Sequence, residues 1–154
     1  MNQKKIVITS GYFNPIHSGH MNLLREAKKL GDFLVVIVNN DEQVKAKGSI
    51  PFMSVEERMS IIQDLKHVDE VFLSVDSGKP IAESLRAIAQ KYLTHDKQAH
   101  VELIFAKGGD RSADNIPASE TKVCKEFNIT VVNGVGGGKV QSSSWLLNSI
   151  KQSS

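Results

Sequence analysis

Residues 5–20 read Lys-Ile-Val-Ile-Thr-Ser-Gly-Tyr-Phe-Asn-Pro-Ile-His-Ser-Gly-His, a short apolar run followed by a polar segment that contains glycine. The run at 5–9 is rich in β-branched residues, which predicts a buried β-strand. Residues 19–30 then carry leucine and alanine at helical spacing, and Gly31 ends the pattern. A buried strand that leads through a short turn into a helix is the repeating unit of a parallel α/β sheet.

The same alternation continues to the end of the chain. Further strands are predicted at 33–38, 70–74, 101–105 and 130–132. Helical patterns lie between them, and Ser54 with Glu57 three residues later forms a capping box that opens one helix. We therefore predict an α/β fold, a parallel sheet with helices on both faces. In such sheets ligands bind beyond the carboxyl ends of the strands.

Composition limits the class of protein. The chain has 154 residues, so we expect residues 1–154 to form one domain. A net charge of +2, with Lys and Arg scattered, does not indicate a nucleic-acid partner. The longest apolar run, 33–38, is far shorter than the roughly 20 residues of a membrane-spanning helix, so no membrane partner is expected. A single cysteine, Cys124, and no apolar leader predict a cytoplasmic protein.

Two histidines stand where the first predicted helix begins. His17 and His20 are three residues apart, so they fall on one side of the turn, and Gly19 lets the backbone approach a ligand closely. A helix N-terminus attracts phosphate through free N–H groups and the helix dipole. Two histidines there could also simply cap the turn or bind zinc, although the chain has no Cys pair and no His-Glu-x-x-His motif.

Residues 11–20 resemble the first motif of the cytidylyltransferase-like nucleotidyltransferase superfamily, Gly-Thr/Ser-Phe-Asp-x-x-His-x-Gly-His. Residues 23–42 and 57–71 are similar to the glycerol-3-phosphate cytidylyltransferases and their relatives. Residues 107–110 resemble a segment of the heptose-1-phosphate adenylyltransferases, and the serines at 142–144 stand where the family has a Ser/Thr motif opening the last helix.

The resemblance implies a Rossmann-like domain with five parallel strands in the order 3-2-1-4-5. It implies an enzyme that transfers a nucleoside monophosphate from a nucleoside triphosphate to a phosphorylated small molecule and releases pyrophosphate. CTP with a polyol or alcohol phosphate is favoured, followed by ATP with a sugar 1-phosphate or a vitamin-type phosphate. The alternative from another class is a nucleotide-binding module without catalysis. A homodimer is also implied.

The resemblance assigns roles to individual residues. Four would contact the phosphates during transfer as catalytic residues: His17, His20, Lys45 and Lys47. Nucleotide contacts are implied for Ser10, Gly11, Tyr12, Phe13, Gly19, Gly108, Gly109, Asp110, Ser142, Ser143 and Ser144. Substrate contacts are implied for Arg58 and Lys66. No metal ligand is expected from the protein, because Mg²⁺ would arrive with the nucleotide.

The chain departs from the family pattern at several positions. Tyr12 replaces Thr or Ser, Asn14 replaces Asp, and Lys66 replaces an Arg of the glycerol-phosphate enzymes. We expect residues 39–52 to form a mobile loop that closes the two lysines over the triphosphate. We expect the loops at 106–111 and 133–144 to select the nucleobase.

Overall fold

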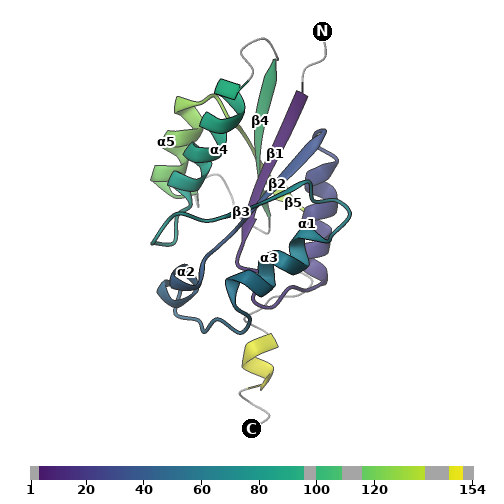
Figure 1. The fold of residues 1–154 in the computed structure, drawn as a ribbon, viewed down its shortest axis with the longest axis vertical. Coiled ribbons are helices and arrows are strands. Elements are labelled where there is room, and N and C mark those ends of the chain that lie inside the picture. The colour runs from purple at the N-terminus through teal and green to yellow at the C-terminus, as the bar shows by residue number, and fades with distance from the viewer. Residues whose placement is uncertain (1–3, 96–99, 109–115, 138–145, 151–154) are drawn as a thin grey trace.

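The computed structural model describes residues 4–95, 100–108, 116–137 and 146–150. Five parallel strands form one sheet in the order β3-β2-β1-β4-β5, which confirms the predicted class and strand order (Figure 1). The strands are β1 (Lys4–Gly11), β2 (Phe33–Val38), β3 (Glu70–Leu73), β4 (Val101–Gly108) and β5 (Thr130–Val135). The helices are α1 (Ser18–Lys28), α2 (Asp41–Ala46), α3 (Val55–Gln63), α4 (Ala82–His95) and α5 (Ala118–Glu126), and residues 146–150 are also helical.

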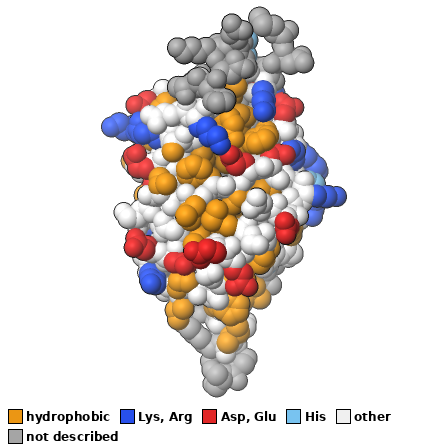
Figure 2. All heavy atoms as spheres, viewed as in Figure 1, with side chains coloured by type: hydrophobic (Ala, Val, Ile, Leu, Met, Phe, Trp, Pro, Cys, Tyr) orange, Lys and Arg blue, Asp and Glu red, His pale blue; other side chains and the backbone are white. Residues whose placement is uncertain are grey.

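Helices cover both faces of the sheet, with α1 and α3 on one side and α4 and α5 on the other (Figure 1). Alternating side chains of β1 supply the two cores, because successive residues of a strand point to opposite faces. Ile6 and Ile8 pack with α4 and α5, whereas Val7 packs with α1 and α3. The edge strand β3 is thinly covered: Leu73 is 43% exposed, and Figure 2 shows apolar side chains gathered on this side of the molecule.

One element differs from the sequence prediction. Residues 41–46, expected to belong to a mobile loop, form helix α2. Asn40 caps it by accepting the Gln43 N–H at 2.9 Å, and the Gln43 side chain accepts the Asn40 N–H at 3.0 Å. The Asn-x-x-Gln spacing is a capping-box signal that the sequence contains but that our reading missed.

Every strand runs in the same direction, so the carboxyl ends gather at one edge, the lower end of the sheet in Figure 1. Helices α1 and α2 begin at this edge, each directly after a strand. Among the residues that the structure describes, no helix is long and apolar enough to cross a membrane.

Candidate functional site

The carboxyl ends of β1 and β2 lie side by side and carry most of the predicted site. Gly11 pairs with Val38 at the end of the register, and the Asn39 N–H donates to the Gly11 carbonyl at 3.0 Å. The turn that leads from β1 into α1 therefore lies against the turn that leads from β2 into α2. Together they bring the histidines of one turn and the lysines of the other to one edge of the sheet.

The two histidines cap helix α1 reciprocally. His17 Nδ1 accepts the Gly19 N–H at 3.1 Å, and His20 Nδ1 accepts the His17 N–H at 3.1 Å. Their rings stack with centroids 3.7 Å apart. A capping box ordinarily uses Ser or Thr with Glu or Gln, so here two imidazoles satisfy the N–H groups of the first turn. The capping alternative raised for these residues is therefore correct, and it is compatible with a role in phosphate binding.

This arrangement sets the protonation of both rings. An Nδ1 atom that accepts an N–H cannot carry a proton, so each neutral ring has its proton on Nε2. Burial, together with the nearby His17 and Lys47, lowers the pKa of His20 to about 3. His20 is therefore neutral at pH 7 and offers an Nε2–H donor rather than a positive charge.

Gly11 and Phe13 support His20 from below. A Cβ at residue 11 would lie 2.7 Å from the Phe13 ring, so only glycine leaves room for that ring. Phe13 is fully buried, and its ring meets the His20 ring edge to face with centroids 4.7 Å apart. The predicted nucleotide contact of Phe13 can therefore not be made by its side chain, which instead holds His20 in place.

The two predicted lysines are placed differently. The Lys47 ammonium lies 4.3 Å from the centroid of the Tyr12 ring and close enough to His20 to lower its pKa. Lys45 and Lys47 are two residues apart on helical backbone, so their side chains project about 200° apart around the axis. The structure brings Lys47 to the histidines and directs Lys45 to another side of α2.

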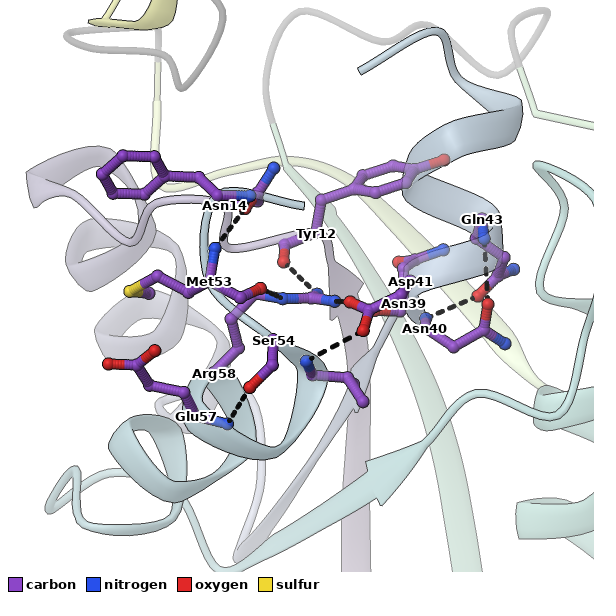
Figure 3. Close-up of polar contacts among 12 residues, drawn as sticks. Tyr12, Asn14, Asn39, Asn40, Asp41, Gln43, Met53, Ser54, Glu57 and Arg58 are labelled. Atoms are coloured by element: carbon purple, nitrogen blue, oxygen red, sulfur yellow. Dashed lines mark hydrogen bonds and ion pairs between the residues drawn. The ribbon is translucent and has the colours of Figure 1, made fainter. Parts of the chain in front are cut away.

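Asn14 explains one departure from the family pattern. It is 3% exposed, and its amide donates to the Ile50 carbonyl at 2.7 Å. Its Oδ1 accepts the N–H groups of Phe52 and Met53 at 2.7 and 3.1 Å, and Figure 3 shows the Asn14 side chain beside Met53. A carboxylate could accept the same two N–H groups but could not donate to Ile50. The asparagine thus ties the histidine turn to the segment before α3.

Arg58 lies inside the protein rather than on its surface. It is 1% exposed, and its guanidinium donates to the carbonyls of Tyr12 at 2.7 Å, Asn39 at 2.6 Å and Met53 at 3.0 Å. It also forms an ion pair with Asp41 at 2.6 Å, as Figure 3 shows. The side chain expected to contact substrate is thus buried and bonded to protein oxygens, which corrects that prediction.

The position of Lys66 also differs from that expected for a substrate contact. It is exposed in the turn between α3 and β3, at the amino end of β3, which is the opposite edge of the sheet from His17 and His20. This position does not support the predicted substrate contact of Lys66, which stays a prediction.

The remaining predicted residues divide into two groups. Ser10 is the next-to-last residue of β1 and Gly108 ends β4, both at the edge where the histidines lie, and the Gly19 N–H is used by the His17 cap. Residues 109–110 and 142–144, which include Gly109, Asp110 and the three serines, lie outside the described residues.

A buried ion pair that sequence reasoning missed lies next to Gly108. Lys107 Nζ and Glu120 Oε1 are 3.1 Å apart, and the other Glu120 oxygen accepts the Ile81 N–H at 3.1 Å. Both side chains are almost completely buried. The pair joins the end of β4 to α5 and to the start of α4. Buried carboxylates and ammonium groups are normally paired. The pair could therefore have been found only from the burial of both residues, which the sequence does not show.

Fold and site together define a Rossmann-like domain that gathers His17, His20 and Lys47 at the carboxyl edge of its sheet. A family model described as cytidylyltransferase-like matches residues 8–134. The chain belongs to this cytidylyltransferase-like family of nucleotidyltransferases.

Two curated relatives and one solved structure illustrate the likeness. The FAD synthase of Thermococcus sibiricus is 38% identical over 132 residues, which cover 84% of this chain and 80% of that protein. The bifunctional protein HldE of Desulfatibacillum aliphaticivorans is 38% identical over 119 residues, and the match spans 76% of this chain but only 22% of HldE. A lipopolysaccharide core biosynthesis protein from Thermoplasma volcanium superposes with a TM-score of 0.64 at 26% identity, covering 84% of this chain and 95% of that one.

Proposed function

We propose that this chain is an adenylyltransferase that moves AMP from ATP onto the phosphate of a small molecule. A phosphate oxygen of the acceptor attacks the α-phosphorus of ATP, and a new P–O bond forms. The bond from the α-phosphorus to the oxygen that bridges to the β-phosphorus breaks, and its electron pair leaves with pyrophosphate. The observation that carries the proposal is the meeting of His17, His20 and Lys47 at the N-terminus of α1.

These groups suit nucleotidyl transfer. The reaction needs alignment and stabilisation of developing charge more than covalent help from the protein. Two Nε2–H donors fixed at a helix N-terminus can bind phosphate oxygens, and the Lys47 ammonium offsets negative charge. An ionised acceptor phosphate needs no general base, which fits a His20 whose pKa is about 3.

Magnesium enters with the substrate in this proposal. In the part of the chain that the structure describes, no three His, Cys, Asp or Glu side chains are grouped as metal ligands. The nearby carboxylate of Asp41 is bonded to Arg58. We expect a Mg²⁺ ion to be carried by the triphosphate and water, where it would neutralise phosphate charge.

The choice of ATP rests on the relatives. One of them is named FAD synthase, and the match covers 80% of that protein. FAD consists of an adenylate joined to the phosphate of a flavin. The sequence motifs alone favoured CTP and a polyol phosphate, and this preference stays a prediction beside the new one. The homodimer and the cytoplasmic location also stay predictions.

Pyrophosphate release tests the proposal. The protein is incubated with Mg²⁺, a panel of phosphate esters that includes flavin mononucleotide and sugar 1-phosphates, and ATP, CTP, GTP or UTP in turn. We expect ATP to be preferred by at least about tenfold in kcat/KM, because a site that pairs with one base leaves polar groups unpaired with another. A preference for CTP would restore the first prediction. Nucleotide binding without pyrophosphate from any pair would indicate a binding module instead.

A further inference from the structure

Arg58 joins three segments of the chain, around residues 12, 39–41 and 53. Its guanidinium bonds the Tyr12 carbonyl in the histidine turn, the Asn39 carbonyl after β2, the Asp41 carboxylate at the start of α2, and the Met53 carbonyl before α3. Figure 3 shows these acceptors around the guanidinium. The Arg58 side chain has no exposed surface, so its guanidinium bonds only to protein groups.

Helix α2 depends on such contacts. It has six residues, and isolated helices of that length are unstable in water. Asp41 anchors its first turn to Arg58 through Oδ1, and Oδ2 of the same carboxylate accepts the Val55 N–H at 3.4 Å. Gln43 fixes the middle of the helix by donating to the Gly78 carbonyl at 2.7 Å. The position of α2 is therefore set by bonds from its own side chains to groups outside the helix.

These contacts connect Tyr12 to both ends of helix α2. The Tyr12 carbonyl binds Arg58, Arg58 binds Asp41 at one end of α2, and Lys47 at the other end lies over the Tyr12 ring. The same guanidinium thus holds both the turn that carries the histidines and the helix that carries the lysine. A shift of α2 relative to that turn would move the Lys47 ammonium away from His20.

A structural anchor alone would not require an arginine. Burying a guanidinium has a desolvation cost, and well-packed apolar residues often replace buried ion pairs without loss of stability. What the planar fork provides is direction: it meets four acceptors at fixed angles, which a lysine ammonium cannot reproduce.

We propose that Arg58 is a positioning residue that acts through α2, holding Lys47 in register with His17 and His20 for nucleotidyl transfer. Arg58 has this role only if the chain catalyses the transfer proposed above. Arg58 itself touches neither nucleotide nor acceptor, and its effect on the reaction passes through Lys47.

The test combines two substitutions in a cycle. Arg58→Lys and Lys47→Ala are made singly and together, and kcat and KM for ATP are measured for all four proteins. We expect Arg58→Lys to lower kcat about tenfold when Lys47 is present and less than about twofold when residue 47 is Ala, because coupled residues are not additive. An equal factor in both backgrounds would show that Arg58 only stabilises the fold and would overturn the proposal.

Asp41→Asn provides a second route if Arg58→Lys does not fold. It weakens the anchor of α2 without changing the arginine. In the same cycle with Lys47→Ala, Asp41→Asn should lower kcat only in the protein that retains Lys47. Arg86→Lys is the matched control. Arg86 pairs with Glu126 on the surface between α4 and α5, so its replacement should leave kcat unchanged.

Hydrogen–deuterium exchange gives a readout that needs no activity. In the nucleotide-free protein, Arg58→Lys and Asp41→Asn should speed exchange in residues 41–47 at least about tenfold, with β1 unchanged, since local opening reports local anchoring. Unchanged exchange in α2 would refute the positioning role. Absence of pyrophosphate release by the wild-type protein with every donor would instead refute the proposed function, so the two failures are distinct.

Discussion

The histidine turn and the lysine helix meet at the same edge of the sheet, but they are positioned by different means. His17 and His20 are held by each other and by the backbone N–H groups of their own turn, all within four residues. Lys47 sits on a short helix that is anchored through Arg58, 17 residues from Asp41 in sequence. Local bonds orient the two imidazoles, although tertiary contacts also hold their turn, whereas tertiary contacts alone place Lys47. The histidines should therefore tolerate changes elsewhere in the protein better than Lys47 does.

The largest expected effect comes from removing one imidazole donor without removing the cap. In His20→Gln the amide oxygen can still accept the His17 N–H, because Gln at this position completes an ordinary capping box. When the amide oxygen caps the turn, the amide N–H₂ group does not take the place of the imidazole Nε2–H. The donor is therefore misplaced, and kcat should fall about 10²–10³-fold while the melting temperature changes little. Steady-state kinetics with thermal unfolding measures both.

His17 allows the same separation. His17→Ala should lose about 0.5–2 kcal/mol of unfolding free energy with the cap, whereas His17→Asn should keep most of it, since Asn is a good N-cap residue. Both variants should lose turnover to the same extent. If His20→Gln kept near-normal turnover, His20 would only cap the helix and would have no part in the reaction.

The second effect is on stability as a function of pH. Free histidine has a pKa near 6.5, and burial, together with the nearby His17 and Lys47, lowers that of folded His20 to about 3. Between these values the unfolded chain binds a proton that the folded protein does not, so stability is complete above about pH 6.5 and falls as the pH is lowered. From pH 7 to pH 5 the wild-type protein should lose about 2 kcal/mol more than His20→Gln.

Urea unfolding at the two pH values, on both proteins, measures this difference. The groups that face His20 are His17, Lys47 and the uncharged Phe13 ring, and the first two remain in the variant. A parallel loss in the two proteins would show that His20 titrates normally, and that its Nδ1 is not held by the His17 N–H in solution.

The difference between the two regions also explains what the sequence could predict. The alternation of apolar runs and helical patterns was sufficient for the α/β class, because burial on both faces of a parallel sheet demands such runs. The histidine pair could be predicted because both residues lie within one short segment at the start of a helix. The strand order and the roles of individual residues came from the resemblance.

Arg58 and Lys66 show the limit of sequence reasoning. Both are basic residues in or after the same predicted helix, and nothing in their neighbours distinguishes a buried side chain from an exposed one at the far edge of the sheet. Arg58 faces inward because carbonyls from three separate segments and the Asp41 carboxylate converge on it. That convergence exists only in the folded chain, and for the same reason the donor role of Asn14 was invisible.

The smallest expected effect separates the two lysines. Lys47→Ala should lower kcat/KM for ATP about tenfold, because it removes the cation beside His20 and the Tyr12 ring. Lys45→Ala should change it less than about twofold, because that side chain projects from another side of α2 than Lys47. The two lysines are matched in type, exposure and distance along the chain, so each substitution is the control for the other.

The outcome decides between the pair that the family motif implies and the single lysine that the structure favours. While α2 remains helical the two side chains leave it on different sides, so Lys47 is the lysine that lies beside the histidines. Equal losses in the two variants would mean that α2 unwinds when nucleotide binds, as a closing loop would, and that Arg58 releases Asp41 in the process. Unequal losses would mean that α2 stays folded through the reaction. Arg58 would then fix the position of Lys47 during the reaction, whereas His17 and His20 are oriented by the bonds with which they cap their own helix.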